Sequence, residues 1–251
     1  MAKSKKDMKK YNIQIFKLGN QEYDYVFNEL TKYQSKIFSV TIFDEIIELP
    51  ETNSNMVFST NEIKKILIPR YDQENFDICI GFLDYRLNGE KYNNIYGSNI
   101  KDNKIFVVTF YQIAKILATE NIKLLNFVLV IIYRYLTRSL INIGGSHDIT
   151  RGCINDMCIN KTDIVFSCEK PILCHDCMRE INKQSSPKGY ILRLEKELKK
   201  IRTVLYYKII RFIKKHSKWS LFIGAIFTIV LNLISNWIFY LIQRFCIFFC
   251  Q

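Results

Sequence analysis

The sequence predicts an α/β domain with a mixed sheet and packed helices, followed by a cysteine-rich segment, a basic helix and one long apolar helix. Three observations support this class. Strand-like and helix-like patterns alternate through the first 145 residues. Five cysteines gather between residues 146 and 181, four of them in two short-spaced pairs, and residues 219–242 contain no charged side chain. Hydrophobic residues make up 49% of the 251-residue chain, which is enough to bury a core.

Local patterns place the elements of the α/β domain. NIQIFKL at 12–18 alternates apolar and polar residues, and KIFSVTIF at 36–43 is rich in β-branched and aromatic residues. The nearly continuous apolar run at 104–111 predicts a central strand, and the helix at 61–68 should end before Pro69. The expected order is strand 12–18, helix 21–34, strand 36–43, helix 61–68, strand 76–87, strand 104–111 and a long helical stretch at 112–143.

The middle of that helical stretch is strongly apolar. LLNFVLVIIY at 124–133 is too short to cross a bilayer, and Arg134 and Arg138 follow it. A buried core helix is therefore the better interpretation, and we expect it to end at the two glycines 144 and 145.

Composition divides the chain into six parts. The net charge of +12 comes mainly from the first ten residues and from residues 179–218. The parts are a basic tail at 1–11, the α/β domain at 12–145, a cysteine segment at 146–181, a linker with a basic amphipathic helix at 182–218, an apolar helix at 219–242 and a short tail at 243–251.

The cysteine segment has the spacing of a metal site. Cys153 and Cys158 form Cys-x4-Cys, and Cys174 and Cys177 form Cys-x2-Cys after a further fifteen residues. Two short-spaced pairs can bring four thiolates to one tetrahedral Zn²⁺ and leave no open position for a reactive water. The basic N-terminus has no apolar run behind it, so we expect a reducing compartment and a structural zinc ion. Cys168 and His175 do not fit the paired spacing and are interpreted as bystanders.

The apolar stretch at 219–242 is long enough to cross about 30 Å of hydrocarbon as a helix. Lys and Arg cluster before it, which predicts a single-pass membrane protein with its N-terminal domain in the cytoplasm. The basic helix suits the anionic lipids of the inner leaflet. Asn232, Ser235 and Asn236 would let the span pair with a protein partner or with itself. The basic charge adjoins this span, which favours lipid over nucleic acid as its partner.

The order of features resembles the archaemetzincins, zinc metallopeptidases of the metzincin type. The matching positions are Asp84, the Tyr96-Gly97 turn, the strand from Ile105 to Phe110, the helix around Val128 to Leu140 and the four cysteines. The resemblance implies a metzincin-like fold with a four-cysteine structural zinc site.

One departure bears on chemistry. Archaemetzincins carry His-Glu-x-x-His on this helix, because two histidines one turn apart bind zinc and the glutamate activates its water. Here the helix offers Tyr133, Arg134, Tyr135 and Thr137, and neither His nor Glu occurs from 122 to 146. Gly152 stands where the family has its third histidine. No catalytic residue is therefore assigned. His147 beside Asp148 is the one pair that could act as a general base, although a surface dyad or a contact to the cysteine segment is the preferred interpretation.

These observations favour a membrane-anchored, non-catalytic sensor or scaffold, a pseudo-metallopeptidase acting in signalling or as a defence effector. Two alternatives stay open. One is a divergent zinc metallopeptidase with other ligands, and the other is a zinc-ribbon protein that binds nucleic acid through its basic charge.

Overall fold

The computed structural model describes residues 10–20, 22–50, 56–98, 104–140, 147–150, 152–184, 189–201, 209, 213 and 216–249. The chain divides into two compact units, Met1–Thr203 and Val204–Gln251. The basic tail expected at 1–11 lies almost entirely outside the described residues.

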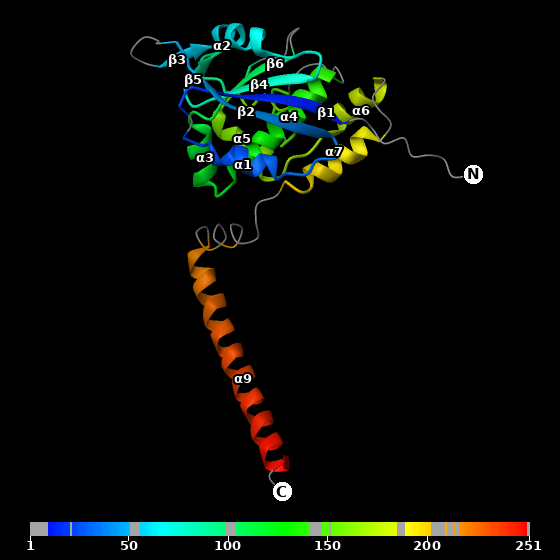
Figure 1. The fold of residues 1–251 in the computed structure, drawn as a ribbon. Helices are drawn as coiled ribbons and strands as arrows, with labels where there is room; N and C mark the ends of the chain where they lie inside the picture. The colour runs from blue at the N-terminus through cyan, green and yellow to red at the C-terminus, as the bar shows by residue number, and fades with distance from the viewer. Residues whose placement is uncertain are drawn as a thin grey trace, which may run out of the picture. The chain divides into compact units, whose positions relative to one another are not determined.

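The first unit is built on a four-stranded sheet in the order β2-β1-β4-β6 (Figure 1). All three neighbouring pairs are parallel. Every residue of β4 and β6 is buried, which explains their continuous apolar sequences. The strands are β1 (Tyr11–Leu18), β2 (Phe38–Ile47), β4 (Ile78–Leu83) and β6 (Ile105–Thr109), and a separate parallel pair joins β3 (Val57–Ser59) to β5 (Arg86–Asn88).

The antiparallel component expected of a mixed sheet comes from a short segment beside β6. Gly97 forms an antiparallel bridge with Val108. The amide of Ser98 donates to the Val107 carbonyl at 2.8 Å, and the amide of Thr109 donates to the Tyr96 carbonyl at 3.0 Å. This pairing fixes the segment Tyr96–Ser98 at the sheet edge, where it contributes to the site described below.

The long helical stretch expected at 112–143 is two helices, α3 (Ile113–Thr119) and α4 (Leu124–Leu140). The expectation of one helix was wrong because Asn121 takes a left-handed conformation, with φ of 54°, and turns the chain between them. The amide of Ile122 then donates a hydrogen bond to the Leu117 carbonyl at 2.8 Å, so this carbonyl at the C-terminal end of α3 has a partner.

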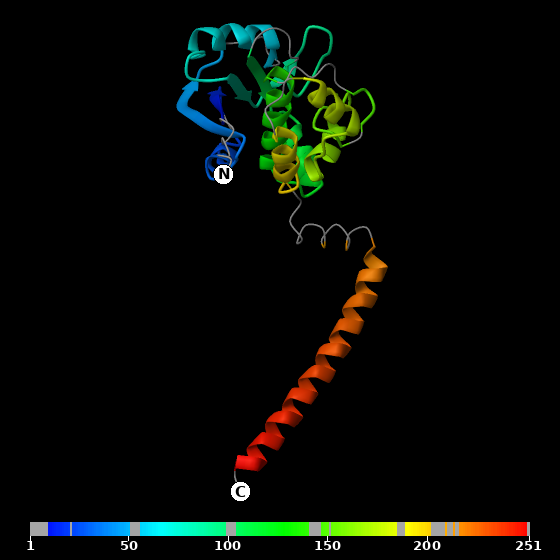
Figure 2. The ribbon, with the colours of Figure 1, turned by 90° about the vertical axis from the view of Figure 1, so that its right-hand side faces the viewer.

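The sheet separates two cores. Ile78, Ile80 and Phe82 of β4 face a core formed with α1 (Tyr25–Thr31) and α4, whereas Cys79 and Leu83 face α2 (Thr60–Leu67). Figure 2 shows α4 between the sheet and the helices of the cysteine segment. Its residues from 127 to 137 are all buried, which confirms the expectation of a core helix.

Short elements follow α4. They are the 3-10 turn at Lys161–Asp163, α5 (Ile164–Glu169), α6 (His175–Lys183) and α7 (Tyr190–Leu198). The linker and basic amphipathic helix predicted at 182–218 overlap α7. Residues 185–188, 202–208, 210–212, 214 and 215 of that range lie outside the described residues.

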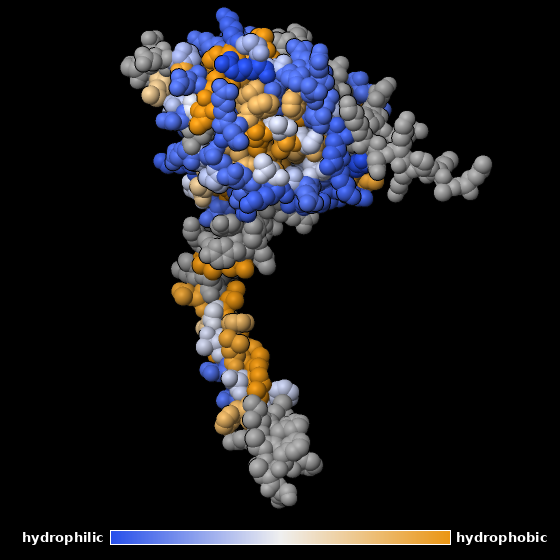
Figure 3. Space-filling model, in the orientation of Figure 1, coloured by the Kyte–Doolittle hydropathy of each residue, from blue (hydrophilic) through white to orange (hydrophobic). Residues whose placement is uncertain are grey.

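The second unit contains α9 (Ser217–Phe249). Within it, Leu221–Phe239 has a mean hydropathy of 2.0 and is 0% buried inside this structure. Figure 3 shows hydrophobic side chains along this helix. One helix is thus long and apolar enough to cross a membrane, judged by length and composition. α9 continues to Phe249, through most of the residues expected as a short tail at 243–251.

Candidate metal centre and the pocket beside α4

Four side chains converge in the cysteine segment. The ligand atoms of His147, Cys153, Cys174 and Cys177 all lie within 4.8 Å of one another. The Nε2 atom of His147 is 3.1 Å from the Sγ atoms of both Cys174 and Cys177. The Sγ atoms of Cys153 and Cys177 are 3.8 Å apart.

Backbone pairing holds these residues together. Cys153 bridges Ile172 in parallel, so the two cysteine-bearing turns lie side by side. His147 bridges Asp156, and its carbonyl accepts a hydrogen bond from the Met157 amide at 2.9 Å. Cys174 occupies the N-cap position of α6, and Cys177 lies in the first turn of this helix. Three separate pieces of chain therefore deliver four ligands to one point.

The geometry fits Zn²⁺. Two sulfurs on a tetrahedral zinc with Zn–S bonds of about 2.3 Å lie about 3.8 Å apart, which matches the Cys153–Cys177 separation. Three thiolates with one imidazole form a common structural zinc set. The side-chain amide of Asn155 donates to Cys177 Sγ at 3.2 Å and the Cys174 amide donates to Cys153 Sγ at 3.5 Å, which stabilises the thiolates. Zinc is thus the cofactor that this donor set fits, and all four tetrahedral positions are protein ligands.

Cys158, expected as the fourth ligand, lies outside this group, and His147 takes its place. The chain turns after Cys153, where the Asp156 amide donates to the Cys153 carbonyl at 3.0 Å. Cys158 then adopts a left-handed backbone with φ of 50° and is buried near Arg134. Burial raises the pKa of its thiol to about 11. His147 does not share the paired spacing of the cysteines, so the sequence predicted only a surface dyad or a contact to the cysteine segment.

The two bystanders also lie outside the group. Cys168 is fully buried, and its carbonyl accepts a hydrogen bond from the Asn126 amide group of α4 at 2.9 Å. His175 is paired with Arg179 one turn further along α6, at 3.2 Å. Asp84, a position matched to the archaemetzincins, follows β4 and accepts a hydrogen bond from the Glu22 amide at 2.7 Å. Burial raises the pKa of its carboxyl to about 6.

A buried arginine lies on α4. Arg134 is buried, with an exposed fraction of 6%. Its guanidinium donates to the Tyr96 hydroxyl and to the Asp156 carbonyl. The neighbouring Tyr135 stacks on Phe106 with ring centroids 4.0 Å apart. Arg134 therefore ties α4 to the sheet-edge segment and to the loop that carries Cys153.

A second buried cluster joins α4 to α7. The carboxylate of Glu197 accepts hydrogen bonds from the Tyr133 hydroxyl, from Ser35 Oγ at 2.6 Å and from the Lys36 amide at 2.5 Å. Glu197 is 3% exposed. Tyr190 of α7 also contacts Thr137 of α4 through their hydroxyls at 3.2 Å. Two consecutive residues of α4, Tyr133 and Arg134, thus belong to two different polar clusters.

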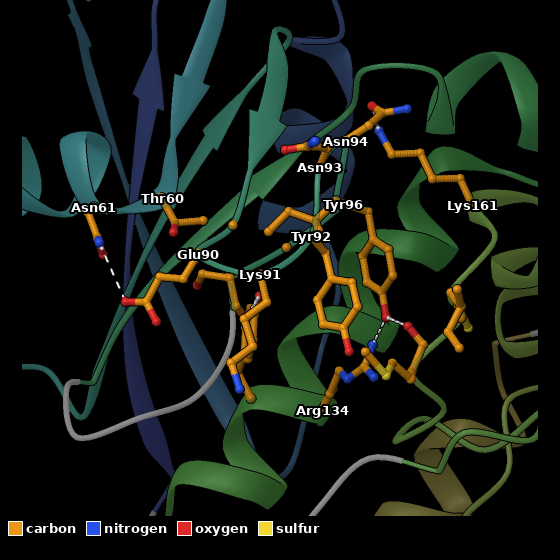
Figure 4. Close-up of a pocket in the computed structure, with 18 of the residues that line it drawn as sticks. Thr60, Asn61, Glu90, Lys91, Tyr92, Asn93, Asn94, Tyr96, Arg134 and Lys161 are labelled. Carbon is orange, nitrogen blue, oxygen red and sulfur yellow. Dashed lines mark hydrogen bonds between the residues drawn. The ribbon is translucent and has the colours of Figure 1, made fainter.

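A cavity of about 550 Å³ lies beside α4. Its walls come from α2, from residues 89–98, from α4 and from residues 157–161. In Figure 4, the Tyr96 hydroxyl points to Arg134, and Tyr92 lies beside them. The charged residues that line the cavity are Lys64, Glu90, Lys91, Arg134, Arg138 and Lys161.

The fold and the Cys3His group define an α/β zinc-binding protein. No family model and no curated protein matches the chain. It is similar to a solved archaemetzincin from Methanopyrus kandleri, with 14% identity and a TM-score of 0.47, over 69% of this chain and 94% of that one. It is also similar to a zinc-dependent peptidase from Methanocorpusculum labreanum, with 12% identity and a TM-score of 0.49, over 68% of this chain and 100% of that one.

A third similar structure is the archaemetzincin from Archaeoglobus fulgidus complexed with malonate. The identity is 15% and the TM-score 0.38, over 67% of this chain and 99% of that one. The family that the sequence resembles is therefore among the solved structures similar to this chain.

Proposed function

We propose that this chain is a membrane-anchored, zinc-stapled binding protein that acts as a non-catalytic sensor or scaffold. The observation that carries the proposal is Arg134. It lies on the helix that would present zinc ligands in a peptidase, and its guanidinium is held by the Tyr96 hydroxyl and the Asp156 carbonyl. A guanidinium stays protonated at neutral pH, so it neither binds zinc nor serves as a general base.

The metal group supports the same function. Metallopeptidase chemistry needs a metal with an open position for a water molecule. A zinc ion held by His147, Cys153, Cys174 and Cys177 would have four protein ligands and no such position. Its contribution would be to folding, because it clamps the chain between residues 147 and 177.

Membrane anchoring belongs to the proposal as well. Leu221–Phe239 of α9 would cross the bilayer once, with the first unit in the cytoplasm and the basic residues before α9 on anionic lipids of the inner leaflet. Self-association of α9 or binding of a protein partner would then depend on the state of the first unit. An effector that perturbs the membrane when triggered is one form of this function.

The contacts of α4 offer a route for such a signal. Arg134 lines the cavity, and the adjacent Tyr133 holds Glu197 of α7. α7 ends at Leu198, only a few residues before the second unit begins at Val204. A ligand that shifts α4 would therefore change the docking of α7 and the segment that follows it.

Metal content and cleavage, measured together on the full chain in detergent micelles, test this function. We expect one zinc per chain and no cleavage of a peptide library, with or without added zinc. Cleavage that a chelator abolishes would contradict the proposal and establish the divergent metallopeptidase. Salt-dependent binding of the full chain to DNA would instead establish the zinc-ribbon alternative.

Fractionation of the same chain tests the anchor. We expect the full chain to stay in the membrane fraction after an alkaline carbonate wash. A chain that carbonate releases into the supernatant would contradict the single span.

A further inference from the structure

The cavity beside α4 has the size of a small-molecule site. Its volume of about 550 Å³ falls within the range of about 300–1,000 Å³ typical of ligand pockets. Close packing holds one wall in place: a Cβ atom on Gly97 would lie 2.6 Å from the Tyr135 hydroxyl, so only glycine lets the sheet-edge segment approach α4 this closely. The wall that carries Tyr96 is therefore set by the fold.

The charge of the cavity is unbalanced. Five lining residues are basic and one, Glu90, is acidic. Glu90 accepts a hydrogen bond from Asn61. Burial lowers the pKa of Lys64, and the charge of Glu90 opposes this shift. In the described part of the chain, the salt bridges are Lys17–Asp24 and Lys183–Glu180, and neither involves a residue that lines the cavity.

The two arginines lie one helical turn apart on α4, at positions i and i+4, and therefore on one face. The hydrogen bonds of Arg134 go to an uncharged hydroxyl and a carbonyl, which satisfy its donors without neutralising its charge. The Nε atom of Arg138 is buried and has no hydrogen-bond partner among the described residues. Burial and the charge of Arg134 lower the pKa of Arg138. An anion bound next to the guanidinium of Arg138 would relieve the repulsion between the two arginines.

The lining residues narrow the class of anion. A guanidinium matches the geometry of a phosphate group. Lys64 of α2 and Lys91 add positive charge to the lining, which favours a ligand with more than one negative charge. Tyr92, with 55% of its surface exposed, and the side-chain amide of Asn93 offer a ring face and hydrogen bonds to a heterocycle. Figure 4 shows the Tyr92 ring next to Tyr96 and Arg134.

We propose that this cavity binds a nucleotide-sized phosphate ester, with Arg138 and Arg134 facing its phosphate groups and Tyr92 packing against its ring. The proposal rests on the proposed function, since it names the ligand that the non-catalytic domain would sense. A phosphate bound to Arg134 and Arg138 would displace α4. The hydrogen bond from the Tyr133 hydroxyl to Glu197 would transmit that displacement to α7.

Calorimetric titration of the full chain in detergent micelles, at about 0.15 M salt to screen exposed charges, tests this assignment. The probes are ADP, ATP, a linear diadenylate, inorganic phosphate and, as carboxylates, citrate and an acidic peptide. We expect the nucleotides to bind and citrate and the peptide not to bind. Binding of inorganic phosphate alone, of citrate or of the peptide would overturn the assignment of a phosphate ester. The assignment would also be overturned if no nucleotide binds at 1 mM, because a dissociation constant of 1 mM corresponds to a binding free energy of only about −4 kcal/mol.

Variants tie the binding to the cavity. Arg138→Gln should weaken nucleotide binding about 10- to 100-fold, the effect of losing a charge-assisted hydrogen bond. Lys64→Gln should weaken it less. Lys65→Gln, on the same helix but exposed and outside the cavity, is the matched control and should leave affinity unchanged. Equal loss in Lys64→Gln and Lys65→Gln would overturn the site.

The zinc content of each variant reports whether it folds. If Arg138→Gln loses zinc, the comparison of Lys64→Gln with Lys65→Gln decides the proposal by itself. Peptide cleavage is measured separately, so a chain that cleaves peptides would contradict the proposed function whatever the nucleotide titration shows.

Discussion

The metal group and the cavity beside α4 share one loop and have opposite electrostatic character. Cys153 at the start of the loop belongs to the metal group, and Cys158 at its end lines the cavity. The metal group gathers three thiols and an imidazole within 4.8 Å, a set that becomes anionic when it binds zinc. The cavity has a volume of about 550 Å³ and is lined by arginines and lysines. The metal group suits a cation that occupies it permanently, and the cavity suits an anion that binds reversibly.

Under the proposed function, this difference is the reason that the domain binds a ligand without cutting it. Metal-dependent hydrolysis would require a metal with an open position beside the substrate. Among the described residues, the clustered metal ligands are those of the closed group, whereas the helix beside the cavity carries Arg134 and Arg138. The metal would hold the loop, and the loop in turn holds Arg134 through the Asp156 carbonyl.

The largest effect should come from breaking the metal group. Cys174→Ser should abolish zinc binding, because it removes one of the four ligands. The loss should also unfold this region, since structural zinc sites contribute on the order of 10 kcal/mol, which is comparable to the stability of a domain. Zinc content and hydrogen exchange of residues 147–184 measure the effect. Cys168→Ala is the control, since Cys168 is buried nearby but outside the group. Zinc retained in Cys174→Ser would contradict the assigned ligands.

A smaller loss should follow from Glu197→Ala. It leaves the Ser35 hydroxyl and the Tyr133 hydroxyl without their buried acceptor, which should lower the free energy of unfolding of the first unit by about 3 kcal/mol. Urea denaturation measures this change. Zinc should be retained, because Glu197 does not contact the metal group, and Glu195→Ala on the same helix is the control. An unchanged unfolding midpoint in Glu197→Ala would refute the role of this carboxylate in docking α7.

Arg134→Met separates the cavity from the metal group. It removes the donors to Tyr96 and to the Asp156 carbonyl, and at the same time a buried charge, so the net loss of stability should be about 1–2 kcal/mol. Zinc content should stay at one per chain while nucleotide binding is lost. Loss of zinc in this variant, with the secondary structure intact, would show that the two regions are not separable.

The smallest effect is expected from Cys158→Ala. This residue was the fourth ligand predicted from the cysteine spacing, but it lies outside the metal group. The variant should keep its zinc and lose no more than about 1 kcal/mol of stability, because it removes one small buried side-chain atom. Zinc loss as complete as in Cys174→Ser would restore the four-cysteine site and refute His147 as a ligand.

Much of the fold could be predicted, because apolar patterns depend on burial. The strand patterns at 12–18 and 104–111 correspond to β1 and β6. The apolar run at 104–111 also indicated a central strand, yet β6 ends the row of parallel strands and is flanked by Tyr96–Ser98. Helices cover both of its faces, so its sequence is as apolar as that of a central strand. The turn at Asn121 had no sequence signal strong enough to divide the helical stretch.

The sites were less predictable. Three of the four metal ligands follow from cysteine spacing, but His147 joins them only through a backbone bridge with Asp156. The cavity is formed by residues between 60 and 161, brought together from α2, the sheet edge, α4 and the cysteine segment. No local pattern marks such a site, because its charge balance exists only after folding.

Zinc K-edge absorption of the full chain, together with its zinc content, tests the central claim most directly. The account predicts one zinc per chain, with three sulfurs at about 2.3 Å and one nitrogen at about 2.0 Å. A second zinc bound by nitrogen and oxygen with a water ligand would contradict it, since that ion would have the open position that hydrolysis requires.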